Sequence, residues 1–180
     1  MITEMDPIFR RMIGVLRLDD ATYEEIEADK KATGQAAYIV VATSLLSGAV
    51  NGVLGSPEDG FFGAIGAFIG WAFYAWVAYI VGVKLFPGKG TRSSWGEIAR
   101  TLGFASTPRF LIVFALIPGI AGWVTSVIGF WILISTIIAL RTALDVSAGR
   151  AIWIAIASTI GQVLIIVAVL VLAATLIGNG

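Results

Sequence analysis

One short run inside an apolar stretch holds residue types that could do chemistry in a membrane: Ser106, Thr107, Pro108 and Arg109. Arginine carries a permanent charge and five N–H donors, so it can bind a phosphate or line a polar cleft. Proline lacks an N–H and frees a carbonyl on the preceding helical turn. We interpret the run as a candidate intramembrane polar site in which Arg109 has one of these two roles. The alternative is that Arg109 extends to the membrane surface or donates to freed carbonyls and nearby hydroxyls.

Catalytic and metal chemistry lack their usual side chains. The sequence contains no histidine and no cysteine, which excludes imidazole and thiolate ligands, disulfides and a thiolate nucleophile. No carboxylate lies near the centre of a predicted span, where a proton-driven transporter usually places one. We therefore predict no enzyme activity, no catalytic or metal-binding residue and no cofactor. The net charge of zero argues against a nucleic-acid partner.

Small residues recur at helical spacing in two of the apolar stretches. The set comprises Ser44, Gly48 and Gly52 in the first stretch, and Gly63, Gly66 and Gly70 in the second. Such faces let the backbones of two membrane helices approach closely. The sequence predicts that these faces pack the two helices of a hairpin together, or that one of them binds a partner protein.

The N-terminal residues indicate an amphipathic helix. Asp6 followed by Pro7 is typical of a helix start. The apolar side chains share one face, and the basic side chains Arg10, Arg11 and Arg17 lie away from it; the apolar set is Ile8, Phe9, Met12, Ile13 and Leu16. We expect the helix to lie at the membrane interface with these arginines in contact with lipid headgroups. The alternative is a short helix packed on the protein's own inner surface.

A second helix is predicted to follow directly. Thr22 and Glu25 have the spacing of a capping box, and no turn signal interrupts the chain up to the first apolar stretch. We predict one helix over residues 23–54, with its second half inside the membrane. Residues 1–32 then form a charged cytosolic arm, and the absence of an apolar segment in them argues against a signal peptide.

The composition predicts an all-α, polytopic membrane protein. Apolar residues make up 58% of the 180 residues and charged residues 13%, against about 25% charged residues in a soluble domain. Five apolar segments follow the arm, and each is long enough for the hydrocarbon core of a bilayer. We predict a membrane domain over residues 33–180 with five transmembrane helices, at about 34–55, 61–86, 98–117, 120–141 and 150–177.

The third span is the one with a competing interpretation. It contains Arg100 and Arg109, and a central arginine costs about 2.5–3.5 kcal/mol on insertion scales. A four-span chain would instead run one helix from Phe110 to Leu140, through Pro118 and Gly119. Charge placement favours five spans, because they put all the lysines and arginines except Arg109 on one side. We therefore predict a cytoplasmic N-terminus and an outside C-terminus.

Several runs resemble the YIP family of Ypt/Rab-interacting membrane proteins, and its bacterial members in particular. They are Thr22–Asp29 with Ala32–Ala36, Gly103–Pro108, and Leu140–Ser147 before Arg150 and Ala151. The resemblance covers nearly the whole chain and implies a five-span domain with a cytosolic N-terminus. Eukaryotic members bind prenylated Rab-type GTPases, but the family's Asp-Leu-x-Gly-Pro motif is absent, and no Asp-Leu pair occurs in this sequence. This argues against a Rab-type GTPase as partner.

These features together predict a non-enzymatic membrane scaffold or adaptor, one version of which is an accessory subunit of a larger membrane complex. We expect its partners to be membrane lipids and other membrane protein subunits, and its location to be a bacterial plasma membrane. The alternative function is a small channel, permease or lipid-handling protein that uses the broken third helix around Pro108 and Arg109.

Overall fold

All regular structure is helical in the ranges that the computed structural model describes, residues 6–88 and 91–178, which confirms the predicted all-α class. The α-helices are α1 (Pro7–Leu16), α2 (Asp20–Ala28), α3 (Ala32–Leu54), α4 (Pro57–Tyr79), α5 (Trp95–Ala105), α6 (Ala121–Leu144) and α7 (Ala148–Gly178). A π-helical end, η1 (Ile80–Leu85), extends α4, and a 3₁₀ helix, η2 (Thr107–Leu116), follows α5.

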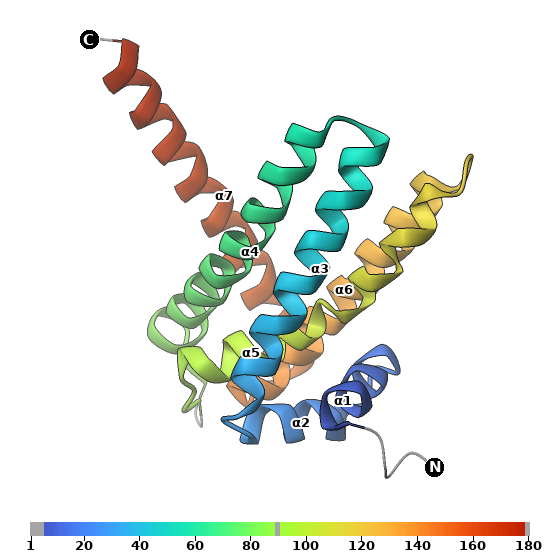
Figure 1. Cartoon of the computed structure of the whole chain (residues 1–180). Coiled ribbons are helices and arrows are strands. Elements are labelled where there is room, and N and C mark those ends of the chain that lie inside the picture. Colours follow the sequence, from blue (N-terminus) through green and yellow to red (C-terminus); the bar gives the residue numbers. More distant parts are fainter. Residues whose placement is uncertain (1–5, 89–90, 179–180) are drawn as a thin grey trace.

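The helix α1 begins where the sequence predicts and lies across one end of the bundle (Figure 1). The Asp6 carboxylate accepts a hydrogen bond from the Ile8 N–H at 2.9 Å, and Pro7 occupies the first turn. Val15 is fully buried, and Met12 packs against the same core. One side of α1 therefore packs on the protein itself, while Phe9 remains 56% exposed.

Two details predicted for the second helix are wrong. Its N-cap is Asp19, whose carboxylate accepts hydrogen bonds from the Thr22 N–H at 3.2 Å and the Thr22 hydroxyl at 2.6 Å. The helix also ends at Ala28 instead of running on to residue 54. The Asp29 carboxylate accepts from the Lys31 N–H at 2.9 Å, and such a local side-chain bond competes with helical hydrogen bonding.

The long helices alternate in direction between the two ends of the molecule. In Figure 1, α3 leaves the end that carries α1 and α2, and α4 returns to it. The helix α6 begins at the far end and also returns, and α7 runs out again, so that the N- and C-termini lie at opposite ends. Because α4 finishes at the end of the molecule that carries the arm and α6 starts at the far end, the segment between them traverses the bundle (Figure 1).

In the part of the chain that the structure describes, four helices are long and apolar enough to cross a membrane: Ala32–Leu54, Gly60–Leu85, Ala121–Leu144 and Ala148–Leu172. They correspond to four of the five predicted spans. The third predicted span, 98–117, is divided between α5 and η2. Pro108 explains the break, because proline cannot donate a helical hydrogen bond and disfavours the α conformation before it. Ten residues of 3₁₀ helix cover about 20 Å instead of about 15 Å in an α-helix.

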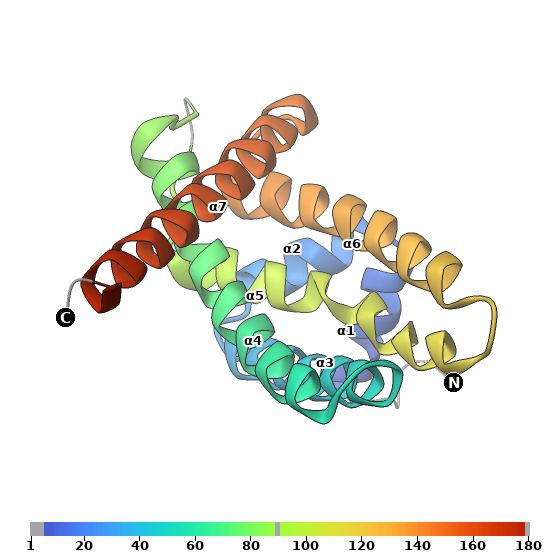
Figure 2. The same cartoon turned by 90° about the horizontal axis from the view of Figure 1, so that it is seen from above.

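The larger buried hydrophobic cluster includes the arm as well as the long helices. Its larger fully or almost fully buried side chains come from α1, α2, α3, α5 and α6; they are Val15, Tyr23, Ile26, Ile39, Ile98, Phe104, Leu140 and Leu144. By contrast, residues 163–172 of α7 are all exposed. In the view from above, α7 crosses the other helices obliquely and its C-terminal half leaves them (Figure 2).

Candidate functional site

A cavity of about 320 Å³ lies among α3, α4, α5, η2, α6 and α7, at the level of the α5–η2 break. Its polar lining residues come from α4, the α5–η2 junction, η2, α6 and α7; they are Trp71, Tyr74, Ser106, Arg109, Thr136 and Gln162. Gly70 and Gln162 also line it and lie near the centres of the apolar helices Gly60–Leu85 and Ala148–Leu172. The cavity is therefore inside the apolar belt of the protein.

Most polar groups around this cavity are already bonded to backbone carbonyls. The Gln162 side-chain amide donates to the Gly70 carbonyl at 3.1 Å, and thus joins α7 to α4. The Trp71 indole N–H donates to the Ala99 carbonyl at 3.2 Å, and the Tyr74 hydroxyl to the Ala155 carbonyl at 3.3 Å. These bonds hold the walls of the cavity in place, because donors in an apolar surrounding are costly to leave unpaired.

The four residues of the predicted polar site have different positions. Ser106 and Arg109 line the cavity, whereas Thr107 and Pro108 are buried and do not line it. The Ser106 and Thr107 hydroxyls donate at 2.6 Å to the carbonyls of residues 103 and 104 at the end of α5. Among the residues that the structure describes, the Arg109 guanidinium has no hydrogen bond and no ion pair.

An apolar groove of about 600 Å³ adjoins this polar cavity. It runs between α6 and α7 and shares Tyr74, Ile132 and Thr136 with the cavity. Ile156 and Ile160 on its α7 wall are 44% and 54% exposed. The groove therefore opens on the outer, apolar surface of the bundle, and it leads from there toward Arg109.

The arm is fixed to the bundle by buried arginines. Arg11 is only 6% exposed, and its guanidinium donates to Glu25 at 3.0 Å, to Asp29 at 2.7 Å and to Gln35 at 2.6 Å. Gln35 belongs to α3, so this one side chain connects α1, α2 and the first long helix. Arg11 is thus engaged within the protein, and headgroup contact remains a prediction for the other two arm arginines.

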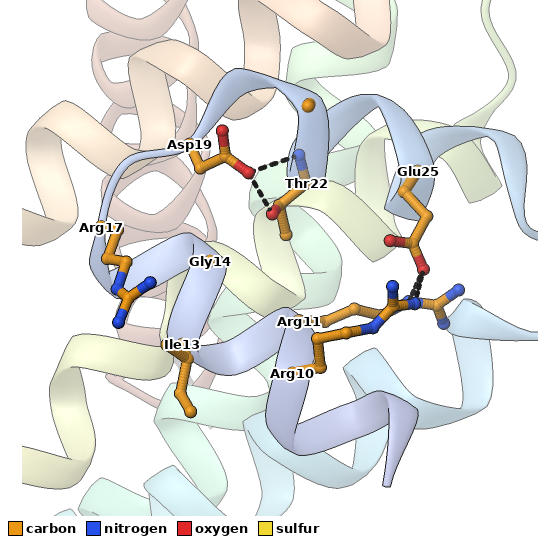
Figure 3. A pocket seen from close by; sticks show the side chains of 9 residues that line it. Arg10, Arg11, Ile13, Gly14, Arg17, Asp19, Thr22 and Glu25 are labelled. Atoms are coloured by element: carbon orange, nitrogen blue, oxygen red, sulfur yellow. Dashed lines mark hydrogen bonds and ion pairs between the residues drawn. The ribbon is translucent and has the colours of Figure 1, made fainter. Parts of the chain in front are cut away.

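Those two arginines border a hollow of about 710 Å³ between α1 and α2 (Figure 3). Arg10 shares the Glu25 carboxylate with Arg11, at 2.7 Å, while Arg17 stands at the other end of the hollow (Figure 3). The guanidinium groups of Arg10 and Arg17 therefore lie apart and do not form one common anion site. Arg10 and Arg17 are exposed, which leaves them accessible to negatively charged headgroups.

A second buried arginine connects α5 to the end of α2. Arg100 is 4% exposed, and its Nε donates to the Ile26 carbonyl at 3.0 Å and the Glu27 carbonyl at 2.8 Å. These carbonyls belong to the last turn of α2, where no helical N–H is available. A cation there also interacts favourably with the negative end of the helix dipole. Arg141 adds an ion pair from α6 to Asp20, at 2.5 Å.

Acid should loosen this arm through Asp29. The hydrogen bond from Arg11 holds the pKa of the Asp29 carboxyl below its ordinary value. A depressed pKa gives stability that is present above the ordinary value of about 3.9 and is lost as the pH falls through the folded-state pKa. We expect the temperature at the midpoint of thermal unfolding, followed by circular dichroism, to decrease when the pH is lowered below about 4. The decline should be smaller in Asp29→Asn; equal declines would contradict this role of Asp29.

The family model of the Yip1 domain matches residues 13–177. The chain belongs to the Yip1 family. No curated protein and no solved structure matches it. Family membership and the four apolar helices fit a multi-pass membrane protein.

In this Yip1 domain the first small-residue face packs α3 against α4. A Cβ atom on Gly48 would lie 2.5 Å from the Gly60 carbonyl oxygen, and one on Gly60 would lie 3.1 Å from Gly52. Ser44 is buried on the same helix. The closest approach in the hairpin therefore depends on Gly60, which the small-residue spacing in the sequence did not single out.

The second small-residue face of the Yip1 domain is not used in the same way. A Cβ atom on Gly63 or Gly66 would meet nothing within 4 Å, and both residues are exposed. Gly70 turns toward Gln162, 3.9 Å from where its Cβ would be. The structure thus separates the predicted set into a packed face on α3 and an open face on α4.

Proposed function

We propose that this Yip1-family chain is a non-enzymatic membrane scaffold that docks helices of other membrane protein subunits. The observation that carries the proposal is the open glycine face of α4, Gly63 and Gly66, which no part of the described chain covers. Without side chains, this face allows the backbone of a second helix to come close. A chain that collects partners in this way acts as an adaptor or an accessory subunit of a larger complex.

The proposal includes five membrane crossings with the arm in the cytoplasm of a bacterial cell and the C-terminus outside. The opposite positions of the two termini support an odd number of crossings (Figure 1). In this arrangement α5 and η2 together make the third crossing, and neighbouring helices cover the broken backbone, as broken helices in membranes require. The basic residues of the arm and of the α5 start then face the cytoplasm, in line with the positive-inside rule.

Gly66→Leu should weaken partner docking while it leaves the fold intact. The new side chain projects into open space, so it blocks close approach from outside without disturbing the chain's own packing. We expect at least a roughly tenfold loss of association, about 1.4 kcal/mol, measured as the amount of membrane protein that co-purifies after crosslinking in native membranes. Gly122→Leu on α6, where space is also open, is the matched control. Equal recovery from both variants would count against the scaffold.

A second candidate function, lipid handling, is favoured by one specific observation. The polar cavity at Arg109 and the apolar groove between α6 and α7 share part of their walls. Both volumes fall in the range of about 300–1,000 Å³ that is common for small-molecule sites. The neighbourhood of Pro108 and Arg109 supports the handling of an amphiphile better than a channel, because the described residues form a cavity with an apolar side opening.

A further inference from the structure

Arg109 is a charge without a counter-ion among the described residues. Arg109 lines the cavity, no aspartate or glutamate shares its lining, and its guanidinium has no partner among the described residues. An unpaired charge in an apolar surrounding is strongly unfavourable, and proteins usually pair it or neutralise it. Arginine cannot be neutralised under ordinary conditions. An anion from outside the chain is the missing partner.

The route to the cavity indicates what kind of anion this is. The adjoining groove is lined by isoleucine, leucine and alanine together with Tyr74 and two threonines, and its α7 wall is exposed at the depth of the apolar helices. Lipid chains are what surrounds such a surface in a membrane. We propose that Arg109 binds the phosphate of an acidic phospholipid whose acyl chain lies in the groove between α6 and α7. This inference rests on the lipid-handling function proposed above.

The donors around the cavity explain why Arg109 is central to this site. The side chains of Trp71, Tyr74 and Gln162 already donate to backbone carbonyls. The charged donors in the described lining that remain without a partner are the five N–H groups of Arg109, and their planar fork matches two phosphate oxygens. Bidentate charge-assisted hydrogen bonds of this type are the strongest that a side chain offers to phosphate.

The same lining explains the preference for a headgroup with net negative charge. A zwitterionic headgroup would bring its own ammonium group next to Arg109. The described residues that line the cavity include no carboxylate that could receive that ammonium, and like charges close together in an apolar site repel. The site therefore discriminates by the absence of acidic residues as much as by the presence of the arginine.

Native mass spectrometry of the full chain in detergent tests the site directly. The protein is titrated with dioleoyl phosphatidylglycerol and, separately, with dioleoyl phosphatidylcholine. We expect the wild-type protein to bind phosphatidylglycerol about tenfold more tightly than phosphatidylcholine. Arg109→Gln should lose this preference, whereas Arg109→Lys, which keeps the charge but not the fork, should keep part of it. The exposed loop residue Arg92 provides the control, Arg92→Gln.

The groove is tested without touching Arg109. Gly129 lines the groove, and a Cβ atom there would meet nothing within 4 Å. Gly129→Phe should therefore fill the groove and leave the thermal unfolding midpoint unchanged. The affinity for both phosphatidylglycerol and phosphatidylcholine should fall at least fivefold. Gly122→Phe adds the same side chain to the same helix outside the groove, and should leave binding unchanged.

Three results would overturn the site. They are equal phosphatidylglycerol affinity in wild type and Arg109→Gln, unchanged binding in Gly129→Phe, and displacement of the lipid by millimolar inorganic phosphate, which would indicate a free-anion site. Transport is measured separately, as movement of fluorescent phosphatidylglycerol across the bilayer of proteoliposomes. Specific binding without movement would uphold the site and reject the lipid-handling function.

Discussion

Gly48→Leu is expected to disrupt the α3–α4 hairpin, with the largest loss of stability of any substitution considered for this protein. The Cβ atom alone would lie 2.5 Å from the Gly60 carbonyl oxygen and 2.9 Å from the Ala64 Cβ. Both obstacles are backbone or directly attached to it, so no side-chain rotation can relieve the clash. Overpacking usually costs about 1–3 kcal/mol, and a rigid backbone contact places this variant at or above the upper end.

The measurement is the thermal unfolding midpoint of the purified protein in detergent, together with its yield from membranes. Gly63→Leu is the matched control, because it adds the same side chain to the partner helix at a place with open space. We expect Gly48→Leu to give little folded protein and Gly63→Leu to behave like wild type. Similar midpoints for the two variants would show that α3 and α4 are not packed in this register.

Arg100→Met is expected to release the arm while the long helices remain folded. Methionine keeps an unbranched apolar stem, although it is shorter than arginine, and it removes the donors to the carbonyls of Ile26 and Glu27. Hydrogen bonds to a charged group contribute about 1.5–3 kcal/mol. A loss of about 3 kcal/mol corresponds to roughly hundredfold weaker protection of the docked arm.

Hydrogen exchange measured by mass spectrometry distinguishes the arm from the bundle. Peptides that cover α1 and α2 should exchange much faster in Arg100→Met, and peptides that cover α6 should change little. Arg92→Met, at an exposed position in the loop before α5, controls for the loss of a positive charge on this side. Unchanged protection of α2 in Arg100→Met would mean that Tyr23 and the Arg11 network hold the arm without it.

The helical class and most of the spans could be predicted because a membrane leaves few choices. Long apolar segments must satisfy their backbone hydrogen bonds internally, and a helix does so. Four of the predicted spans match helices that are able to cross. The division of α5 from η2 was only partly foreseeable, because Pro108 indicates where a helix breaks and not which helix follows.

The candidate site was predictable in its charge and not in its surroundings. Arg109 stands out because an arginine inside an apolar stretch is costly. Tyr74 and Gln162 line the same cavity. This depends on how α4 and α7 are rotated about their axes and shifted along them. A single sequence contains no direct signal for those quantities.

The structure of the arm was predicted wrongly for a different reason. Local patterns favoured one uninterrupted helix after Thr22, but Asp29 bonds to Arg11 and to the Lys31 N–H, and the chain turns there. The sequence places Arg100 in the third predicted span but does not indicate its partners, which are main-chain carbonyls more than seventy positions away. Such long-range contacts follow from the folded arrangement and have no local pattern.

The length of α7 has a consequence for the bilayer around the protein. Its apolar part, Ala148–Leu172, is about 37 Å long at 1.5 Å per residue, and a typical hydrocarbon core is about 30 Å thick. The oblique course of α7 across the bundle (Figure 1) shortens the distance that it covers along the membrane normal. In a thin bilayer the helix must tilt further or thicken the lipid beside it, and this hydrophobic mismatch favours residence in thicker membrane regions.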